Sequence, residues 1–134
     1  MEDCDRIESA RAMQELKRDL LTSKYTKVLV EVGYRYNAPH YYVVLPSNPD
    51  RDADTPTLAR IHFQEGPIKE CGVNGVCNED LINMVIDRLE HFQKSEFACR
   101  ENAMAITKLE EALLWLRKRT MGREQRGVEG THTV

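Results

Sequence analysis

The sequence lacks three features that would each assign it to a known class of proteins. No apolar run approaches the ~20 residues needed to span a bilayer, so we expect no membrane-spanning segment. Neither charge sign dominates, because 19 basic and 22 acidic residues leave a formal net charge of −3, which excludes a strongly basic coat for polymeric nucleic acid. Neither GxxxxGK[ST], GxGxxG nor a nucleophile-elbow pattern occurs, and no catalytic set is recognised. A binding protein without turnover fits better than an enzyme.

Cysteine spacing gives no sign of a metal site. The sequence has no CxxC pair and no cysteine–histidine spacing of a structural zinc site, so we expect no metal and no cofactor. The start of the chain, MEDCDRIESARAMQEL, is acidic and polar and does not fit a secretory signal. We therefore expect a cytosolic setting in which all four cysteines are reduced thiols: Cys4, Cys71, Cys77 and Cys99.

The 134 residues, with 41% hydrophobic and 31% charged side chains, have the composition of a globular protein. The first half, residues 1–63, combines an amphipathic pattern with runs rich in β-branched and aromatic residues. We predict there a helix and an antiparallel sheet, with the helix at Glu8–Leu21 and strands at Thr26–Tyr36, Tyr41–Leu45 and Leu58–Phe63.

Residues 64–134 predict a helical hairpin. A glycine-rich segment leads to Asn78, a predicted N-cap, and to a helix over Glu79–Gln93. A short break separates it from a longer helix over about Ala98–Met121, so the two should pair antiparallel. The predicted apolar stripes are Leu81, Val85, Leu89 and Phe92 in the first helix, and Ala105, Ile106, Leu109, Leu113 and Leu116 in the second.

These elements predict the α+β class, with a small N-terminal sheet and helix followed by a C-terminal helical hairpin that oligomerises. Two helices and three strands make only a small core. Apolar surface left uncovered on such a hairpin is usually covered by another copy of the chain.

The end of the second helix is a candidate anion site. Arg119 and Arg123 are four residues apart, so a continuous helix places both guanidinium groups on one face, where two donor forks fit a diphosphate. Gly122 permits a bend that would redirect Arg123. The alternative is that these cations only stabilise the helix C-terminus, where positive charge is favoured.

Three further side chains admit both a functional and a structural interpretation. Phe92 and Phe97 flank the break between the helices and either close the core or offer a stacking surface for a base. Asn102 lies on the charged side of the second helix, and its amide either contacts a base or ribose or is simply exposed.

From Phe63 onward, linked segments become specific: FQEGPIKE, GVNGV, NEDL, FACRENAMAITKLEEAL, RKRT and REQRGVEGTHTV. Together they resemble the C-terminal hairpin domain shared by the phage Thoeris anti-defence signal-sponge family and its anti-CBASS relatives, which bind cyclic oligonucleotides. The strand-rich stretch before them is similar to the N-terminal sheet of the Thoeris branch.

The resemblance implies a phage protein of the host bacterial cytoplasm that binds, without cleaving, the cyclic ADP-ribose isomer made by TIR-domain Thoeris enzymes. It further implies dimers or trimers of dimers with ligands between protomers, and cyclic trinucleotides at separate sites in some members. The implied ligand-binding residues are Phe92 against the ligand, Asn102 as the amide contact, Arg119 and Arg123 as phosphate clamps, and Lys69 as a further basic residue.

The sequence departs from the family pattern at one position, and two alternative functions stay open. Many relatives carry threonine where Cys77 stands, which puts trinucleotide binding in doubt. The alternatives are a sponge for CBASS cyclic oligonucleotides only, or a phage protein whose basic helix end binds an acidic protein partner rather than a nucleotide.

Overall fold

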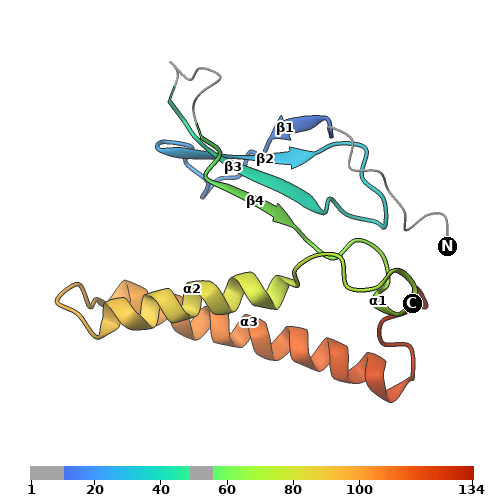
Figure 1. The fold of residues 1–134 in the computed structure, drawn as a ribbon. Helices are drawn as coiled ribbons and strands as arrows, with labels where there is room; N and C mark the ends of the chain where they lie inside the picture. The colour runs from blue at the N-terminus through green and yellow to red at the C-terminus, as the bar shows by residue number, and fades with distance from the viewer. Residues whose placement is uncertain (1–10, 49–55) are drawn as a thin grey trace. The chain divides into compact units, whose positions relative to one another are not determined.

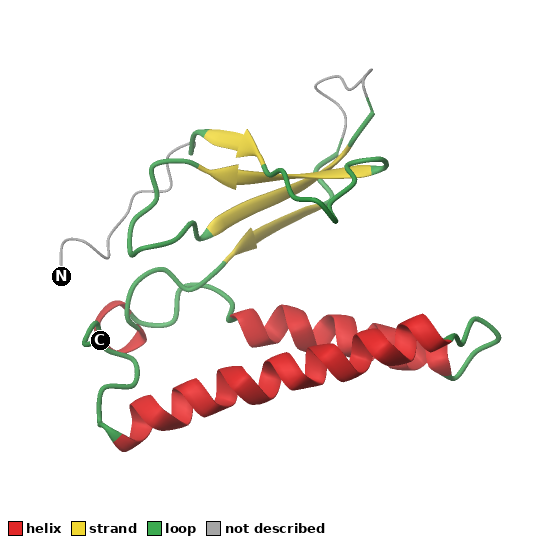
Figure 2. Cartoon of the chain, turned by 180° about the vertical axis from the view of Figure 1, so that it is seen from behind, coloured by secondary structure: helices red, strands yellow, loops and turns green. Residues whose placement is uncertain are grey.

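The computed structural model describes residues 11–48 and 56–134. The described residues form the four strands and three helices drawn in Figures 1 and 2. These are β1 (Met13–Glu15), β2 (Thr26–Glu31), β3 (Tyr41–Pro46), β4 (Ala59–His62), α1 (Ile68–Cys71), α2 (Asn78–Gln93) and α3 (Arg100–Gln125). The chain divides into two compact units, a sheet unit within residues 1–75 and a hairpin unit of residues 76–134. The predicted α+β class is confirmed, while the sequence-based domain division after Phe63 stays a prediction.

The sheet is antiparallel throughout, and its strand order β1-β2-β3-β4 follows the sequence. Branched aliphatic side chains pair across the central strands, with Leu29 of β2 opposite Val43 of β3. Val30, Val43 and Leu45 are buried and form the core of this unit. The three strands predicted from the sequence are therefore present as β2, β3 and β4.

β2 is shorter than predicted, because it ends at Glu31 rather than at Tyr36. Tyr36 and Asn37 both adopt left-handed backbone conformations, with φ angles of 56° and 73°. A residue in this region cannot continue a strand, so the segment between β2 and β3 turns instead.

The helix predicted over Glu8–Leu21 is wrong for residues 11–21, which form β1 and an irregular segment; its first three residues lie outside the described chain. β1 pairs with β2, and beyond it the Leu16 N–H donates to the Val28 carbonyl oxygen at 2.8 Å. Leu20, which the helical pattern placed on the buried stripe, is 98% exposed. Pairing with the edge of β2 satisfies backbone groups of both segments and outweighs a short helical periodicity.

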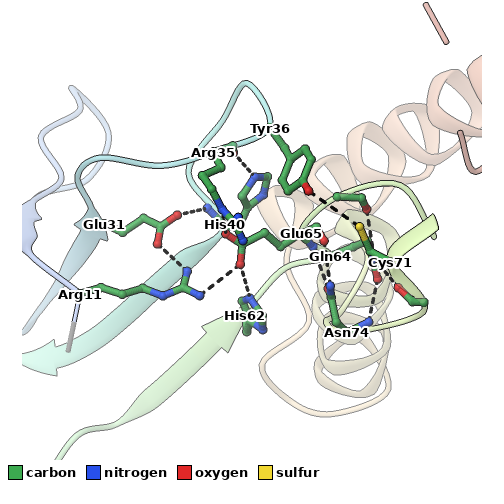
Figure 3. A network of polar contacts seen from close by, with 12 residues as sticks. Arg11, Glu31, Arg35, Tyr36, His40, His62, Gln64, Glu65, Cys71 and Asn74 are labelled. Carbon is green, nitrogen blue, oxygen red and sulfur yellow. Dashed lines mark hydrogen bonds and ion pairs between the residues drawn. The ribbon is translucent and has the colours of Figure 1, made fainter. Parts of the chain in front are cut away.

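Two amide side chains close the segment after β4, residues 64–75 (Figure 3). Gln64 Nε2 donates to the Gly72 carbonyl oxygen at 2.7 Å, and Gln64 Oε1 accepts from the Asn74 N–H at 3.0 Å. The Asn74 amide bonds both backbone groups of Glu65, at 2.8 Å to the N–H and 2.7 Å to the carbonyl oxygen. The two ends of the segment are thereby tied together, and α1 lies between them.

α2 and α3 form the predicted antiparallel hairpin (Figure 2). The N-cap of α2 is Cys77 and not Asn78, which is the first helical residue. Cys77 has the extended backbone of an N-cap, and its N–H donates to Asp80 Oδ2 at 2.8 Å. The Cys99 Sγ caps α3 by accepting from the Asn102 N–H at 3.4 Å. The predicted start of α2 was one residue too late, because the prediction did not consider that a carboxylate at the third helical position can close the cap.

α3 is longer than predicted, since it continues beyond Met121 and runs without interruption through Gly122 to Gln125. Its 26 residues correspond to roughly 39 Å at 1.5 Å per residue. No break at Gly122 redirects Arg123. Neither α3 nor any other helix within the described residues is long and apolar enough to cross a membrane.

The inner face of α2 is centred on Ile86, which is 8% exposed and is the only buried residue of α2 and α3. Val85 and Phe92 of the predicted stripe are instead 47% and 38% exposed. The sequence holds two overlapping apolar series with helical spacing, and the series containing Ile86 packs in the hairpin. α2 therefore carries a second apolar face that its own hairpin leaves exposed.

Cys71 is disulfide-bonded, so the expectation of reduced thiols is wrong for this residue. Cys77 and Cys99 are free, and Cys4 lies outside the described residues. Burial raises the pKa of the Cys77 thiol, and the carboxylates of Asp80 and Glu79 raise it further. The sequence alone does not show which cysteines the fold brings close enough to form a disulfide.

Candidate functional site

The C-terminal end of α3 carries a cationic hollow of about 530 Å³. Its wall combines one indole ring with four basic side chains, and the lining residues are Trp115, Lys118, Arg119, Gly122, Arg123, Arg126 and Val134. The α-helical spacing of Arg119 and Arg123 brings both to this one wall, as predicted. The hollow thus offers several donors of positive charge beside an aromatic surface.

The two predicted clamp residues differ in their surroundings. Arg119 is exposed, and its guanidinium has no partner among the described residues. Arg123 is half-buried, and its Nη2 donates to the carbonyl oxygens of Val128, Thr131 and Thr133 at 3.0, 3.0 and 2.7 Å. The tail after α3 therefore fixes the orientation of Arg123, while Arg119 keeps its whole donor fork for another group.

A second hollow, of about 590 Å³, lies at the turn that joins α2 to α3. It is lined by Asp87, Arg88, His91, Phe92, Ser95 and Phe97. The guanidinium carbon of Arg88 lies 5.4 Å from the centroid of the Phe92 ring, within cation–π range. Phe92 is therefore not a core residue of the hairpin; its ring lies at the surface beside a cation.

The aromatic and the cationic hollow occupy opposite ends of the hairpin. Asn102 lies near the start of α3 and Arg119 near its end, seventeen residues further, which corresponds to roughly 26 Å along the helix. A ligand the size of a dinucleotide cannot bridge this distance. The hairpin of one chain therefore does not bring Phe92 and Asn102 together with Arg119 and Arg123.

A helical hairpin is the arrangement expected from the sequence resemblance, and comparison with known proteins decides the family. Residues 55–121 match the family model described as "Acb2/Tad1, hairpin domain". The chain is also 53% identical over 140 aligned positions to "Thoeris anti-defense 1" of Bacillus phage SBSphiJ7, which covers 90% of this chain and 99% of that protein. The chain belongs to the Acb2/Tad1 hairpin family.

The other two residues carried over from the family lie outside both hollows. Asn102 is half-buried in the first turn of α3, and its side-chain amide has no partner among the described residues. Lys69 is exposed on α1 in the sheet unit. Their proposed roles in the Acb2/Tad1 hairpin stay predictions.

Sequence reasoning missed two basic side chains that cover aromatic rings of this hairpin. Arg88 precedes Phe92 by four residues, and Lys118 follows Trp115 by three, so helical spacing alone places each cation beside its ring. The Lys118 Nζ lies 5.1 Å from the Trp115 centroid. A basic residue three or four positions from an aromatic residue in a helix was the sequence pattern that could have predicted both contacts.

The sheet unit contains a buried charge network that the sequence did not reveal (Figure 3). Arg11 donates to Glu31 at 2.5 Å and to Glu65 at 3.1 Å, and His62 Nε2 lies 3.2 Å from the same Glu65 oxygen. Burial disfavours the charged Arg11, but its hydrogen bonds to both carboxylates outweigh burial and raise its pKa. The network ties the closed segment 64–75 to the sheet, which gives it a structural role.

Proposed function

We propose that this protein counters Thoeris defence by binding and sequestering, without cleaving, the cyclic ADP-ribose isomer glycocyclic ADP-ribose in the host bacterial cytoplasm. The observation that carries the proposal is the cationic hollow, in which Arg119 has an unused donor fork one turn from Arg123. Family membership and the name of the 53% identical phage relative support the same conclusion.

The chemistry of the two hollows matches the two halves of such a signal. Guanidinium groups bind the diphosphate through charge-assisted hydrogen bonds of about 1.5–3 kcal/mol each. An aromatic surface stacks on the adenine base for about 1–3 kcal/mol. These terms approach the roughly 12 kcal/mol of a nanomolar complex only when the cavity is preformed.

The separation of the hollows makes a second copy part of the proposal. An antiparallel neighbour would bring its Arg119 and Arg123 to the Phe92 and Asn102 of the first chain. The exposed apolar face of α2, which includes Met84 and Val85, provides surface for this association. We propose a homo-oligomer, a dimer or a trimer of dimers, with the ligand held between copies.

Release of intact ligand tests sequestration. The protein is mixed with the product of a TIR-domain enzyme, unbound nucleotide is removed, and the complex is heated before mass spectrometry of the supernatant. We expect the unaltered signal at a stoichiometric amount. Altered nucleotide would show an enzyme, and no nucleotide would favour the alternative of a protein-binding phage factor.

A second ligand class is proposed from the family itself, whose model groups Acb2 with Tad1. Cyclic trinucleotides of CBASS would bind at a separate site, and Cys77 counts against this because the resemblance implies a threonine there. Competition between the two nucleotide classes tests it: independent binding supports two sites, whereas binding of cyclic oligonucleotides alone would favour a CBASS-only sponge.

A further inference from the structure

A second phenylalanine shares the aromatic hollow with Phe92. Phe97 lies in the turn between α2 and α3, and both side chains line the same hollow. Phe97 is 67% exposed. A ring exposed to this extent adds little to folding, because most of its apolar surface stays in water. The backbone that carries this ring is nevertheless held by several hydrogen bonds of the turn.

Two polar side chains hold the turn in place. Ser95 Oγ donates to the Phe92 carbonyl oxygen at 2.6 Å and accepts from the Phe97 N–H at 3.1 Å, so one hydroxyl links both phenylalanines. Gln93 bonds both backbone groups of Cys99, at 2.9 Å to the carbonyl oxygen and 3.0 Å to the N–H. The turn therefore presents its two rings on a fixed backbone, and a ligand does not have to order it.

The border of the hollow is polar. Arg88 covers the Phe92 ring from one side, and Asp87 and His91 complete the lining. A lipid chain or an amphipathic helix needs a continuous apolar strip, whereas a heteroaromatic base needs stacking faces bordered by hydrogen-bonding groups. The composition of this hollow fits a base.

We propose that Phe97 is a second base-contacting residue, which holds the base of a cyclic nucleotide together with Phe92, and that Ser95 is the positioning residue for both rings. This inference rests on the proposed function. It extends that function by a binding residue and by the means of its preorganisation.

The substitution Phe97→Leu tests the contact, because it keeps an apolar side chain and removes the aromatic face. We expect the Kd for glycocyclic ADP-ribose to rise about 5- to 30-fold, part of the stacking free energy of a base. The upfield ring-current shifts of the adenine H2 and H8 protons on binding should fall as well. Tyr25→Leu, at an exposed ring of the sheet unit, is the matched control and should change neither quantity.

Ser95→Ala tests positioning. We expect an affinity loss of about three- to tenfold and smaller adenine shifts, with the unfolding temperature lowered by only a few degrees, because the lost hydrogen bonds are exposed. Ser95→Thr keeps the hydroxyl and should restore both readouts.

Three outcomes overturn the inference. Wild-type Kd and adenine shifts in Phe97→Leu would show that the ring does not contact the base. A change in native mass of the oligomer with unchanged adenine shifts would make Phe97 an assembly residue. Failure of Ser95→Thr to rescue Ser95→Ala would remove the positioning role. If wild-type protein binds no signal at all, the proposed function fails instead, so the two failures are distinguishable.

Discussion

Arg119 and Arg123 stand one helical turn apart, but their surroundings prepare them differently for a phosphate. Arg119 has no partner among the described residues, whereas Arg123 is held by three carbonyl oxygens of the tail. Substituting Arg123 therefore disturbs the tail as well as the hollow. Arg119 is the cleaner probe of ligand binding.

We predict that Arg119→Ala weakens binding of the cyclic ADP-ribose isomer at least about tenfold, because it removes a charge-assisted contact of about 1.5–3 kcal/mol. The unfolding temperature should not change, since the side chain is exposed. Arg117→Ala is the control: Arg117 is an exposed cation on the same helix that pairs with Glu124 at 3.3 Å and lies outside the hollow. Calorimetric titration checks both variants. Equal affinities for Arg119→Ala and wild type would show that the phosphate site lies elsewhere.

The buried network of the sheet unit gives a second prediction at this scale. Arg11→Met leaves two carboxylates, Glu31 and Glu65, without their shared cation, and should lower the free energy of unfolding by about 3 kcal/mol. The pKa of Arg11 is raised above its already high ordinary value, because its hydrogen bonds to both carboxylates outweigh burial, so the guanidinium stays charged and the stabilisation is fully present. The loss should therefore be the same at about pH 8 and about pH 10.

Arg60→Met is the comparison for that measurement. Arg60 is exposed and donates to the Tyr41 hydroxyl at 3.3 Å, so its loss should cost less than about 1 kcal/mol in denaturant unfolding. Equal costs for the two variants would show that burial of the network has no energetic consequence.

At the scale of elements, the two apolar faces of α2 have different roles. We predict that Ile86→Ala lowers the free energy of unfolding by about 2–4 kcal/mol, because Ile86 is the one buried residue of the hairpin. Val85→Asp should leave folding intact and reduce the native mass of the oligomer, because Val85 lies on the face that the hairpin leaves exposed. Circular dichroism and native mass spectrometry separate the two effects, and an unchanged mass in Val85→Asp would contradict the assigned interface.

The sequence predicted the elements whose patterns are long. β2, β3 and the hairpin followed from β-branched runs and from apolar series spanning several turns. The helix predicted at Glu8–Leu21 was wrong for residues 11–21, because its apolar spacing covers few turns and the choice between helix and edge strand depended on β2. The choice between the Val85 and Ile86 faces depended on the partner helix, which periodicity alone does not supply.

The site was predicted unevenly. Spacing alone placed Arg119 and Arg123 on one face, while the roles of Phe92 and Asn102 came from family resemblance. The charge network around Arg11 joins residues more than fifty positions apart, and no local pattern indicates such a contact. The same is true of the link between Ser95, Phe92 and Phe97, which depends on the geometry of the turn.

At the scale of the whole molecule, the proposed binding site needs residues of two copies of the chain. The aromatic end and the cationic end of a hairpin lie roughly 26 Å apart along α3, so under the proposed function each ligand would take its base contacts from one chain and its phosphate contacts from a neighbour. Oligomerisation would then also preorganise the cavity.

Complementation between two variants that bind weakly tests this requirement most directly. Phe92→Ala and Arg119→Ala are each purified alone and also co-expressed as a mixed oligomer, and the number of ligand sites is counted by calorimetric titration. In a random mixture, about a quarter of the sites combine an intact Phe92 with an intact Arg119 from the neighbour. We predict that the mixture binds glycocyclic ADP-ribose tightly at about one quarter of the wild-type stoichiometry, whereas each variant alone binds weakly. No tight sites in the mixture would contradict a ligand held between copies.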